Sequence, residues 1–269
     1  MNRAEQRSFN RLLEYIEREM EFETGFYNDA YLDRRISARM RRTDQDDYRE
    51  YQQLLETDDG ERERLLDSLS INVTGFFRNP EAWEALREVL ADLTDSNRRV
   101  RVWSAPCADG REPYSLAMLA LDDDDVDARR IDIVGTDINH DVLDVARAGV
   151  YESSQTTDVA DELEFIEEYS AYVEREGNQF RVRDSVKQMV QFEQHDLIRG
   201  ESKRNFDLVL CRNLLIYIDA AHKTPIFETI RESLRDGGYL MIGMTETLPT
   251  ACRRDFEAVS KKRRIYRRT

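Results

Sequence analysis

The chain has 269 residues, of which 40% are hydrophobic, so it has room for one α/β domain and a smaller unit. Acidic residues outnumber basic ones by 55 to 40, which gives a formal net charge of −15 at pH 7. No apolar run approaches the roughly 20 residues that a membrane-spanning helix needs, and no signal-like segment precedes the first amphipathic pattern. We therefore expect a cytoplasmic protein without direct membrane insertion.

The basic residues are almost all arginine, and lysine occurs only at Lys187, Lys203, Lys223, Lys261 and Lys262. A surface with such an excess of negative charge repels itself at low ionic strength. In 1 M salt the Debye length falls to about 3 Å, and the repulsion fades while the surface stays soluble. We hypothesise a salt-rich cytoplasm, as in a halophilic archaeon; the alternative is an ordinary acidic protein.

The three cysteines, Cys107, Cys211 and Cys252, are odd in number and far apart in the sequence. Few histidines lie near them, so neither a disulfide framework nor a zinc site is expected, and we predict no metal.

Helical periodicity dominates the first 70 or so residues. Apolar side chains recur at helical spacing around 9–20, 32–40, 48–55 and 65–69. No strand pattern interrupts them, and polar or glycine-containing breaks separate them. The pattern predicts a small all-α bundle over residues 1–71. A linker and a linking helix follow over 72–90, with Pro80 suited to the first turn of that helix.

The remaining residues, 91–269, alternate strand and helix patterns. Strands are expected near 99–104, 131–136, 188–193, 206–211 and 238–244, and helices near 112–121, 139–147 and 220–234. This alternation predicts a doubly wound, Rossmann-like α/β domain. A terminal hairpin is expected over residues 256–267. The alternation lapses over 151–187, where two short strand patterns flank a turn at 176–178, which indicates a small β-hairpin subdomain inserted into the domain.

One turn in this α/β region has the pattern of a ligand-binding turn. The strand pattern at 99–104 passes through small residues to Gly110 and then enters a helix with Glu112 in its first turn. The next strand pattern ends on Asp137, where a carboxylate can accept both hydroxyls of a ribose. In open α/β sheets nucleoside ligands bind outside the carboxyl ends of the strands. The sequence therefore predicts a cofactor that carries a ribose.

The same turn favours one class of nucleoside cofactor. Gly110 stands alone, whereas a dinucleotide diphosphate requires three spaced glycines. S-adenosylmethionine has no phosphate and carries a charged amino-acid tail, whose ammonium group Glu112 could face. A favourable carboxylate in the first turn of a helix is an equally simple explanation of Glu112.

Five segments, taken in order and spacing, resemble the chemotaxis receptor glutamate O-methyltransferases, the CheR family. They are residues 71–78, 103–115, 136–139, 146–151 and 211–217. The resemblance covers nearly the whole chain. It implies an S-adenosylmethionine-dependent methyltransferase domain behind a helical bundle. It also implies an enzyme that forms glutamyl 5-O-methyl esters on the cytoplasmic helices of methyl-accepting chemotaxis proteins and releases S-adenosylhomocysteine.

The resemblance also implies which residues surround the cofactor. They are Asn72, Thr74, Arg78, Glu112, Asp137, Asp196, Leu197, Arg212 and Asn213. Two positions depart from the usual pattern of the family. Arg111 stands where a second glutamate is common, and Asp196 stands where some members have asparagine.

Arg78 and Tyr217 are the candidate catalytic residues by resemblance, and both would orient the attacking carboxylate and the methyl group. A glutamate side chain is already an anion near pH 7, so transfer needs mainly position and water exclusion. Arg78 could instead form a linker salt bridge, and Tyr217 could simply pack in the core.

Arginines in the second helical segment form a candidate substrate-binding stripe. Arg35, Arg39 and Arg42 follow helical spacing, with Arg41 alongside. The family's use of a basic helix here would suit a receptor helix that carries glutamates. An ordinary solvated helix face is the alternative. The turn of the inserted subdomain is short, so the resemblance suggests independence from a receptor C-terminal pentapeptide.

Three other functions remain open at this point. A nucleic-acid methyltransferase is disfavoured, because the net charge repels phosphates, and no nucleic-acid partner is expected. A catalytically silent module that binds S-adenosylmethionine in signalling is the second alternative. A methyltransferase acting on another protein is the third.

Overall fold

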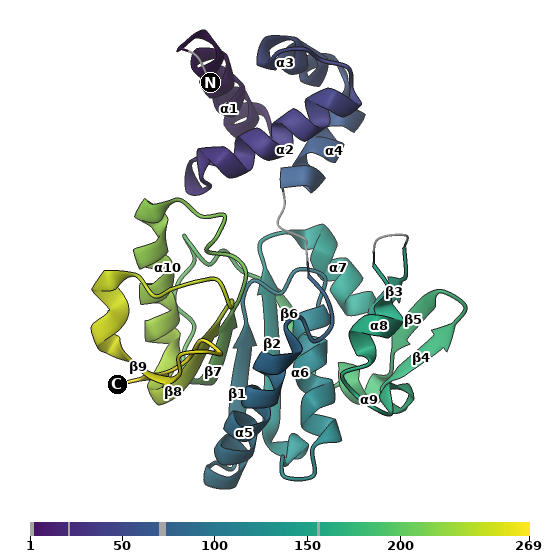
Figure 1. Cartoon of the computed structure of the whole chain (residues 1–269), viewed down its shortest axis with the longest axis vertical. Coiled ribbons are helices and arrows are strands. Elements are labelled where there is room, and N and C mark those ends of the chain that lie inside the picture. Colours follow the sequence, from purple (N-terminus) through teal and green to yellow (C-terminus); the bar gives the residue numbers. More distant parts are fainter. Residues whose placement is uncertain (1–2, 21, 70–73, 155–156) are drawn as a thin grey trace. The chain divides into compact units, whose positions relative to one another are not determined.

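The computed structural model describes residues 3–20, 22–69, 74–154 and 157–269 (Figure 1). It divides into two compact units. The helical unit comprises residues up to Asn72 together with Tyr217–His222, and the sheet unit comprises Val73–Ile216 and Lys223–Thr269.

The helical unit is the expected all-α bundle. Its helices are α1 (Arg3–Met20), α2 (Asp29–Arg42), α3 (Tyr48–Thr57) and α4 (Asp59–Leu69), and a short 3-10 turn, η1 (Thr24–Phe26), follows α1. The side chain of Asn28 caps α2 by accepting the Tyr31 N–H, and that of Asp47 caps α3. The apolar positions of the periodic pattern form the core, where Phe9, Leu12, Ile16 and Leu32 are fully buried.

A segment distant in sequence completes this unit. The Asn28 N–H donates to the Tyr217 carbonyl at 3.0 Å, and Tyr27 and Ile218 form an isolated antiparallel bridge. The ring of Tyr217 lies 4.8 Å from that of Tyr31, centroid to centroid. The helical periodicity of the first 70 residues held no signal for this addition, because the segment follows a strand of the other unit.

A buried ion pair joins α2 to α4. Glu61 is fully buried and accepts hydrogen bonds from Arg39 at 2.9 and 2.5 Å, from the Tyr51 hydroxyl at 2.8 Å and from Arg64 at 3.0 Å. This corrects our expectation for Arg39. Its guanidinium is committed to Glu61 inside the bundle and is not presented on an exposed face.

The sheet unit contains a seven-stranded sheet in the order β6-β2-β1-β7-β8-β10-β9. The first five strands are parallel, and β10 and β9 extend the sheet as the expected antiparallel hairpin. The bounds of the strands are β1 Val100–Ser104, β2 Ile131–Asp137, β6 Val190–Gln194, β7 Phe206–Cys211, β8 Leu234–Ile242, β9 Phe256–Ser260 and β10 Ile265–Arg268. The prediction of a Rossmann-like α/β domain is confirmed.

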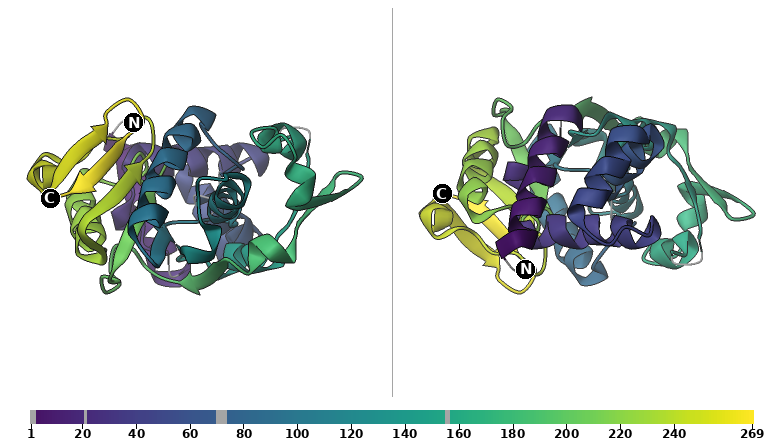
Figure 2. Two further views of the ribbon diagram at one scale, coloured as in Figure 1. Left: turned by 90° about the horizontal axis from the view of Figure 1, so that it is seen from below. Right: turned by 90° about the horizontal axis from the view of Figure 1, so that it is seen from above.

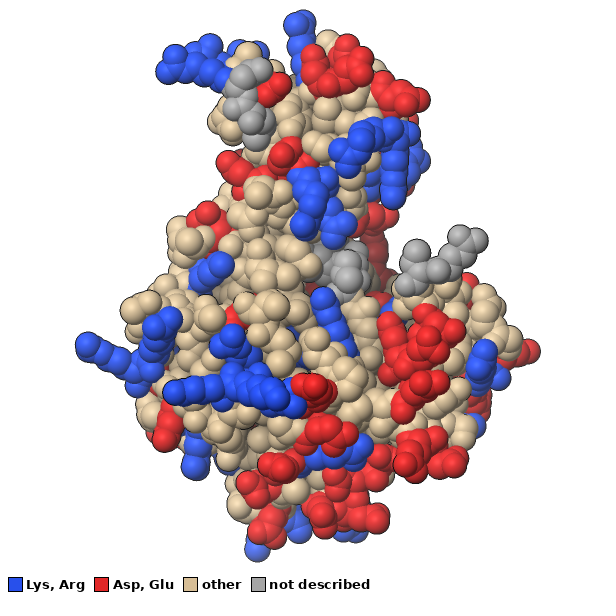
Figure 3. Space-filling view, in the orientation of Figure 1, with Lys and Arg blue, Asp and Glu red and all other residues tan. Residues whose placement is uncertain are grey.

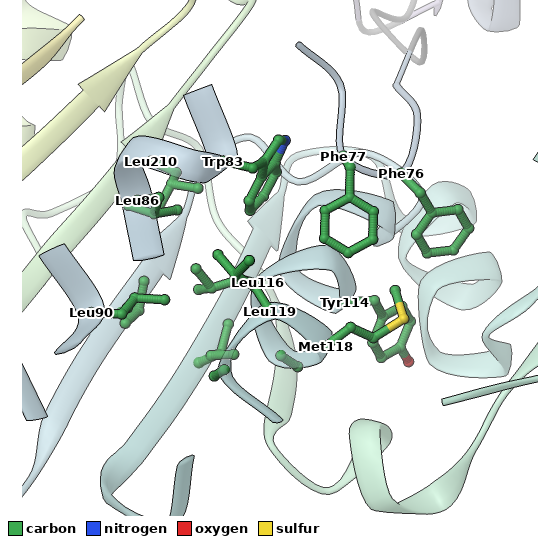
Figure 4. Packing of buried hydrophobic residues seen from close by; sticks show 14 of the residues in the cluster. Phe76, Phe77, Trp83, Leu86, Leu90, Tyr114, Leu116, Met118, Leu119 and Leu210 are labelled. Carbon is green, nitrogen blue, oxygen red and sulfur yellow. The ribbon is translucent and has the colours of Figure 1, made fainter. Parts of the chain in front are cut away.

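The larger helices of the α/β pattern are α5 (Pro80–Ser96), α6 (Arg111–Asp122), α7 (His140–Ala148) and α10 (Ala220–Ser233). Helix α5 begins at Pro80 as expected, but it runs to Ser96 and its apolar face is part of the core of the sheet unit. Figure 4 shows Trp83, Leu86 and Leu90 of α5 close to Leu116 and Leu119 of α6. The linking helix expected to end near residue 90 is therefore an integral helix of the α/β unit.

The insertion forms a separate antiparallel sheet in the order β3-β5-β4, as expected for an inserted β-subdomain. Its elements are β3 Val150–Glu152, α8 Val159–Leu163, β4 Val173–Glu176, β5 Gln179–Val182 and α9 Asp184–Lys187. Gly177, with φ of +64°, makes the tight β4–β5 turn. Figure 2 shows this subdomain and the β9–β10 hairpin at opposite ends of the sheet unit. Strand β3 and the two short helices were not expected.

The cysteines Cys107, Cys211 and Cys252 are free and buried. Within the described ranges, no helix combines the length and the apolarity that a membrane crossing requires.

The first prediction concerns the buried pair of the helical unit. Replacing Glu61 by Gln should lower the free energy of unfolding by about 3 kcal/mol at pH 7, because Arg39 keeps its buried charge without a counter-ion. Burial alone would raise the pKa of Glu61, but hydrogen bonds from Arg39, Tyr51 and Arg64 outweigh burial and hold it below the ordinary value. The loss in free energy of unfolding caused by Glu61→Gln should therefore be complete above the ordinary pKa of glutamate. It should shrink as pH falls through the lower pKa that Glu61 has in the folded protein.

Urea unfolding of the two proteins at neutral and acidic pH measures this difference. Glu63→Gln is the matched control, because Glu63 is exposed on the same helix. Equal stability of Glu61→Gln and Glu63→Gln at pH 7 would contradict the prediction.

Candidate functional site

The carboxyl ends of β1, β2 and β7 lie at one edge of the sheet. Ser104 at the end of β1 is in register with Gly135 of β2 and with Leu210 of β7. The chain then turns back through residues 105–110, and the N–H of Cys107 donates to the Thr136 carbonyl at 2.8 Å. Turn residues are thus tied to the ends of two neighbouring strands, where α/β folds bind nucleosides.

Gly110 ends this turn for two physical reasons. Its φ of +88° lies in the left-handed region, which favours glycine. A Cβ atom at this position would also come within 2.7 Å of the Ala146 Cβ and 3.0 Å of the Phe192 ring. The close approach of the turn to its neighbours therefore requires glycine, independently of any ligand.

Asp137 lies at the end of β2, where the sequence predicts the sugar-binding carboxylate. It is almost fully buried, and its two oxygens accept the Ala108 N–H at 2.9 Å and the Asn139 N–H at 3.0 Å. Burial raises the pKa of Asp137 above its ordinary value, against the effect of these N–H donors. The Ile138 N–H is a third donor, so the carboxylate keeps an acceptor position for a ribose hydroxyl. The geometry fits a ribose.

Glu112 is in the first turn of α6, but it also forms a buried ion pair. It accepts the Ser104 hydroxyl at 2.8 Å and an Arg212 N–H at 3.1 Å. The simple reading as a favourable first-turn carboxylate is therefore incomplete. The pair leaves Glu112 acceptor sites for a further donor such as an ammonium group.

Arg212 follows β7 and is the centre of this arrangement. Its second terminal nitrogen donates to the Arg78 carbonyl at 2.6 Å and to the Asn79 side chain at 3.2 Å. Its guanidinium also lies 5.4 Å from the Trp83 ring centroid. Arg212 therefore binds Glu112 and the start of α5 at the same time.

The connector, residues 74–79, is held by several hydrogen bonds. The Phe76 N–H donates to Glu162 of α8, and the Phe77 N–H donates to the Ser115 hydroxyl, both at 3.0 Å. Phe76 and Phe77 are buried, and Phe77 packs edge-on against Trp83 (Figure 4). The connector thus has a defined conformation against the sheet unit.

Arg111, which departs from the family pattern, also binds the connector. It forms ion pairs with Asp109 and Glu162, each at 3.3 Å, and donates to the Thr74 carbonyl at 3.5 Å. A Cβ on Gly75 would lie 2.7 Å from the Glu162 carboxylate, so glycine is needed at this contact. In this chain Arg111 is therefore a cation that links α6, α8 and the connector.

The side chain of Arg78 is partly exposed, and its carbonyl accepts both Arg212 and the Trp83 indole N–H. Thr74 is likewise partly exposed, while Asn72 lies outside the described residues. Asn79, with φ of +63°, turns the chain into α5. Thr74 and Arg78 are thus both residues of the connector, and both are partly exposed.

Asp196 closes the turn after β6 by accepting the N–H groups of Ile198 at 2.8 Å and Arg199 at 3.0 Å. An asparagine oxygen could accept the same two bonds, so the departure at this position leaves the turn unchanged. Leu197 beside it is buried. The carbonyl of Asp137 accepts the His195 N–H at 3.0 Å, which ties this turn to the end of β2.

Tyr217 belongs to the helical unit, where it packs against Tyr31. The guanidinium of Arg35 lies 5.4 Å from the same Tyr31 ring, so these two predicted residues share a neighbour. Arg41 and Arg42 are exposed at the end of α2, unlike Arg39. Figure 3 shows basic side chains on the helical unit interspersed with acidic ones. A packing role for Tyr217 is compatible with this placement.

Glu246 and Glu162 were missed by the sequence reasoning. Both accept backbone N–H groups of loops beside the site. Glu246 follows the last parallel strand, as Asp137 follows the second, so the same rule about acidic residues after strands could have singled it out. Glu162 carried no such signal, because its helix lies in the irregular insertion.

Comparison with protein families defines the class of this chain. Residues 72–265 match the family described as "CheR methyltransferase, SAM binding domain", and residues 7–70 match "CheR methyltransferase, all-alpha domain". The chain therefore belongs to the CheR methyltransferase family. It is a methyltransferase whose cofactor is S-adenosylmethionine, and the catalytic interpretation is favoured over a silent binding module.

Named relatives place the chain among chemotaxis proteins. It is 33% identical over 235 residues to the "Chemotaxis protein methyltransferase" of Listeria monocytogenes, with 87% of each chain covered. It is 33% identical over 234 residues to a "Probable chemotaxis protein methyltransferase" of Rhizobium etli, which covers 84% of this chain and 87% of the relative. For "Chemotaxis protein methyltransferase 1" of Pseudomonas aeruginosa the identity is 34% over 198 residues, with 70% and 71% covered.

The second prediction tests whether Asp137 is the sugar-binding carboxylate that the sequence predicts. Replacing Asp137 by Asn should weaken binding of S-adenosylhomocysteine by about tenfold or more, because an amide offers one acceptor oxygen where two are needed. Titration calorimetry measures the dissociation constant. Asp141→Asn is the matched control, since Asp141 is exposed in the first turn of α7. Unchanged affinity of Asp137→Asn would remove Asp137 from the site.

Proposed function

We propose that this protein transfers the methyl group of S-adenosylmethionine to glutamate side chains of chemoreceptors and so forms glutamyl 5-O-methyl esters for adaptation. The match of both of its domains to the CheR family carries this proposal. The relatives named as chemotaxis methyltransferases support it. A methyltransferase acting on another protein is the remaining alternative.

The chain needs little acid-base chemistry for this reaction. When bound, S-adenosylmethionine supplies an electrophilic methyl group on a sulfonium, which leaves as a neutral thioether. The substrate glutamate is an anion at neutral pH, since its ordinary pKa is about 4.3, so no base has to remove a proton. The protein contributes by holding the carboxylate in line and by excluding water.

Each candidate cofactor residue has a proposed task. Asp137 accepts the ribose hydroxyls, and Glu112 faces the ammonium group of the amino-acid tail while Arg212 holds it in place. Asp196 and Leu197 lie beside the adenine. The remaining proposed contacts come from the connector and from the loop after β7: Asn72, Thr74, Arg78, Arg212 and Asn213.

Arg78 and Tyr217 are proposed to orient the reacting groups. The carbonyl of Arg78 accepts two donors, the Trp83 indole N–H and Arg212, which fix the connector backbone at this residue. Arg–carboxylate pairs are strong and directional, so one such residue can set the angle of attack.

The receptor is proposed to bind through basic residues of α2. Arg35, Arg41 and Arg42 remain in this surface, and Arg39 leaves it because it is paired with Glu61. A receptor helix with exposed glutamates is complementary to such a surface, which raises the rate of encounter and sets the orientation of the partner.

We infer that this recognition does not need a receptor pentapeptide, because the β4–β5 turn has only two residues, Gly177 and Asn178. The inserted subdomain does have a hollow of about 560 Å³ against β4, whose lining includes Arg175, Arg181 and Arg183. A receptor tail peptide is therefore the probe that tests this inference. Tight binding of a receptor tail peptide in calorimetry would overturn this inference.

We also infer a cytoplasmic location in a salt-rich cell such as a halophilic archaeon. The net charge of −15 and the clustered acidic side chains on the sheet unit support it (Figure 3). Molar potassium chloride should raise both the unfolding temperature and the turnover, since screening removes the repulsion. If stability and activity in 50 mM salt equalled those in molar potassium chloride, this would contradict a halophilic origin.

The third prediction tests the reaction and Arg78 together. Labelled S-adenosylmethionine and receptor-bearing membranes should yield base-labile methyl groups with the wild type. Arg78→Ala should lower turnover by about a hundredfold while the fold is retained, because a misplaced carboxylate reacts poorly. Arg129→Ala, at an exposed site, is the control. Near wild-type turnover of Arg78→Ala would remove Arg78 from the mechanism, and label on another protein would favour the alternative substrate.

The fourth prediction tests the basic surface. The double variant Arg41→Glu and Arg42→Glu should raise the apparent KM for receptor several-fold and leave the affinity for S-adenosylhomocysteine unchanged, because only receptor contact is affected. The double variant Arg11→Glu and Arg49→Glu, on α1 and α3, controls for net charge. An equal KM for the two double variants would favour an ordinary solvated face.

A further inference from the structure

Glu246 is a buried acid that the proposed mechanism does not use. It lies four residues beyond the end of β8 and is only 3% exposed. One carboxylate oxygen accepts the Leu215 N–H at 2.7 Å, and the other accepts the Gly243 N–H at 2.6 Å and the Asn213 N–H at 3.1 Å. The Ile216 N–H is a further donor. One side chain thus binds three backbone donors of the loop after β7 and one donor of the turn after β8.

These donors saturate the carboxylate. A carboxylate has about four acceptor positions, two on each oxygen, and the four N–H groups occupy them. Glu246 therefore has no acceptor left for a substrate or a cofactor, and its effect on the site must pass through the loop that it holds.

The loop has a backbone conformation that needs such support. Asn213 has φ of +60°, in the left-handed region that residues other than glycine adopt rarely, although asparagine adopts it more often than most. Gly243 is equally constrained, because a Cβ on it would lie 2.5 Å from the Glu246 carboxylate and 2.9 Å from the Asn213 nitrogen. The tight packing of these three residues indicates that the carboxylate fixes the loop.

The loop carries Arg212, and Arg212 reaches two other parts of the site. It binds Glu112 at 3.1 Å and the carbonyl of Arg78 at 2.6 Å. Asn213, the next residue, is itself bonded to Glu246 through its backbone. A shift of this backbone would therefore move the Arg212 side chain relative to both partners.

We propose that Glu246 is a positioning residue of the methyltransferase site, and that its carboxylate sets cofactor affinity by fixing the backbone of residues 212–216. The proposal rests on the proposed function, in which Arg212 and Asn213 lie beside the cofactor. The assigned chemistry is specific to a carboxylate, since an amide has one acceptor oxygen and one donor nitrogen. In Glu246→Gln that nitrogen would face backbone donors.

The experiment compares Glu246→Gln with Glu257→Gln, an exposed change on β9. Hydrogen exchange follows the amides of Asn213, Leu215 and Gly243, calorimetry gives the dissociation constant of S-adenosylhomocysteine, and urea unfolding gives stability. For Glu246→Gln we expect faster exchange at these amides and a dissociation constant raised about tenfold or more, with the protein folded. Glu257→Gln should match the wild type.

Faster exchange or lower stability with unchanged affinity would show a merely structural role and overturn the proposal. If Glu246→Gln does not fold, Gly243→Ala tests the same contact, because its added Cβ must displace the Glu246 carboxylate. Unchanged affinity for S-adenosylhomocysteine in Gly243→Ala would also overturn the proposal. Wild-type protein that binds S-adenosylhomocysteine but labels no receptor would contradict the proposed substrate alone, and the affinity comparison would remain valid.

Discussion

The buried guanidinium of Arg212 is the interaction on which the geometry of the site depends. A charge in a protein interior is tolerated only when a counter-ion and hydrogen-bond acceptors compensate for lost water. Here the compensation comes from Glu112 of α6 and from the backbone of Arg78 in the connector, and the Trp83 ring adds to it. Because one side chain must satisfy all of these contacts, the connector, α6 and the end of β7 cannot move independently.

Carboxylates that accept backbone N–H groups stabilise the loops around this pair. Asp137 holds the turn after β1, Glu162 holds the connector, and Glu246 holds the loop after β7. Loops cannot form the regular hydrogen bonds of helices or sheets, so these acceptors satisfy donors that would otherwise be unpaired. Such bonds are buried, so salt screens them little.

The helical unit shows the limit of reading function from charge patterns. Helical spacing placed Arg39 with the other arginines of α2, yet its side chain is buried against Glu61. The pattern of one helix shows which positions share a face, but the neighbouring helix determines whether that face is solvated. The same unit recruits Tyr217 from a distant part of the chain through backbone pairing, which no local pattern encodes.

The sequence by itself determined the elements and the class of ligand. Periodicity identified the bundle, the parallel strands and the hairpins, because burial imposes a repeat of 3.6 or 2 residues. Gly110 and Asp137 predicted from local chemistry the edge of the sheet at which we expect the cofactor to bind. Only the tertiary structure decided the partners of Arg212, the burial of Arg39 and the role of Glu246. Those depend on contacts between residues far apart in sequence, and a one-dimensional pattern contains no information about which distant groups compensate one another.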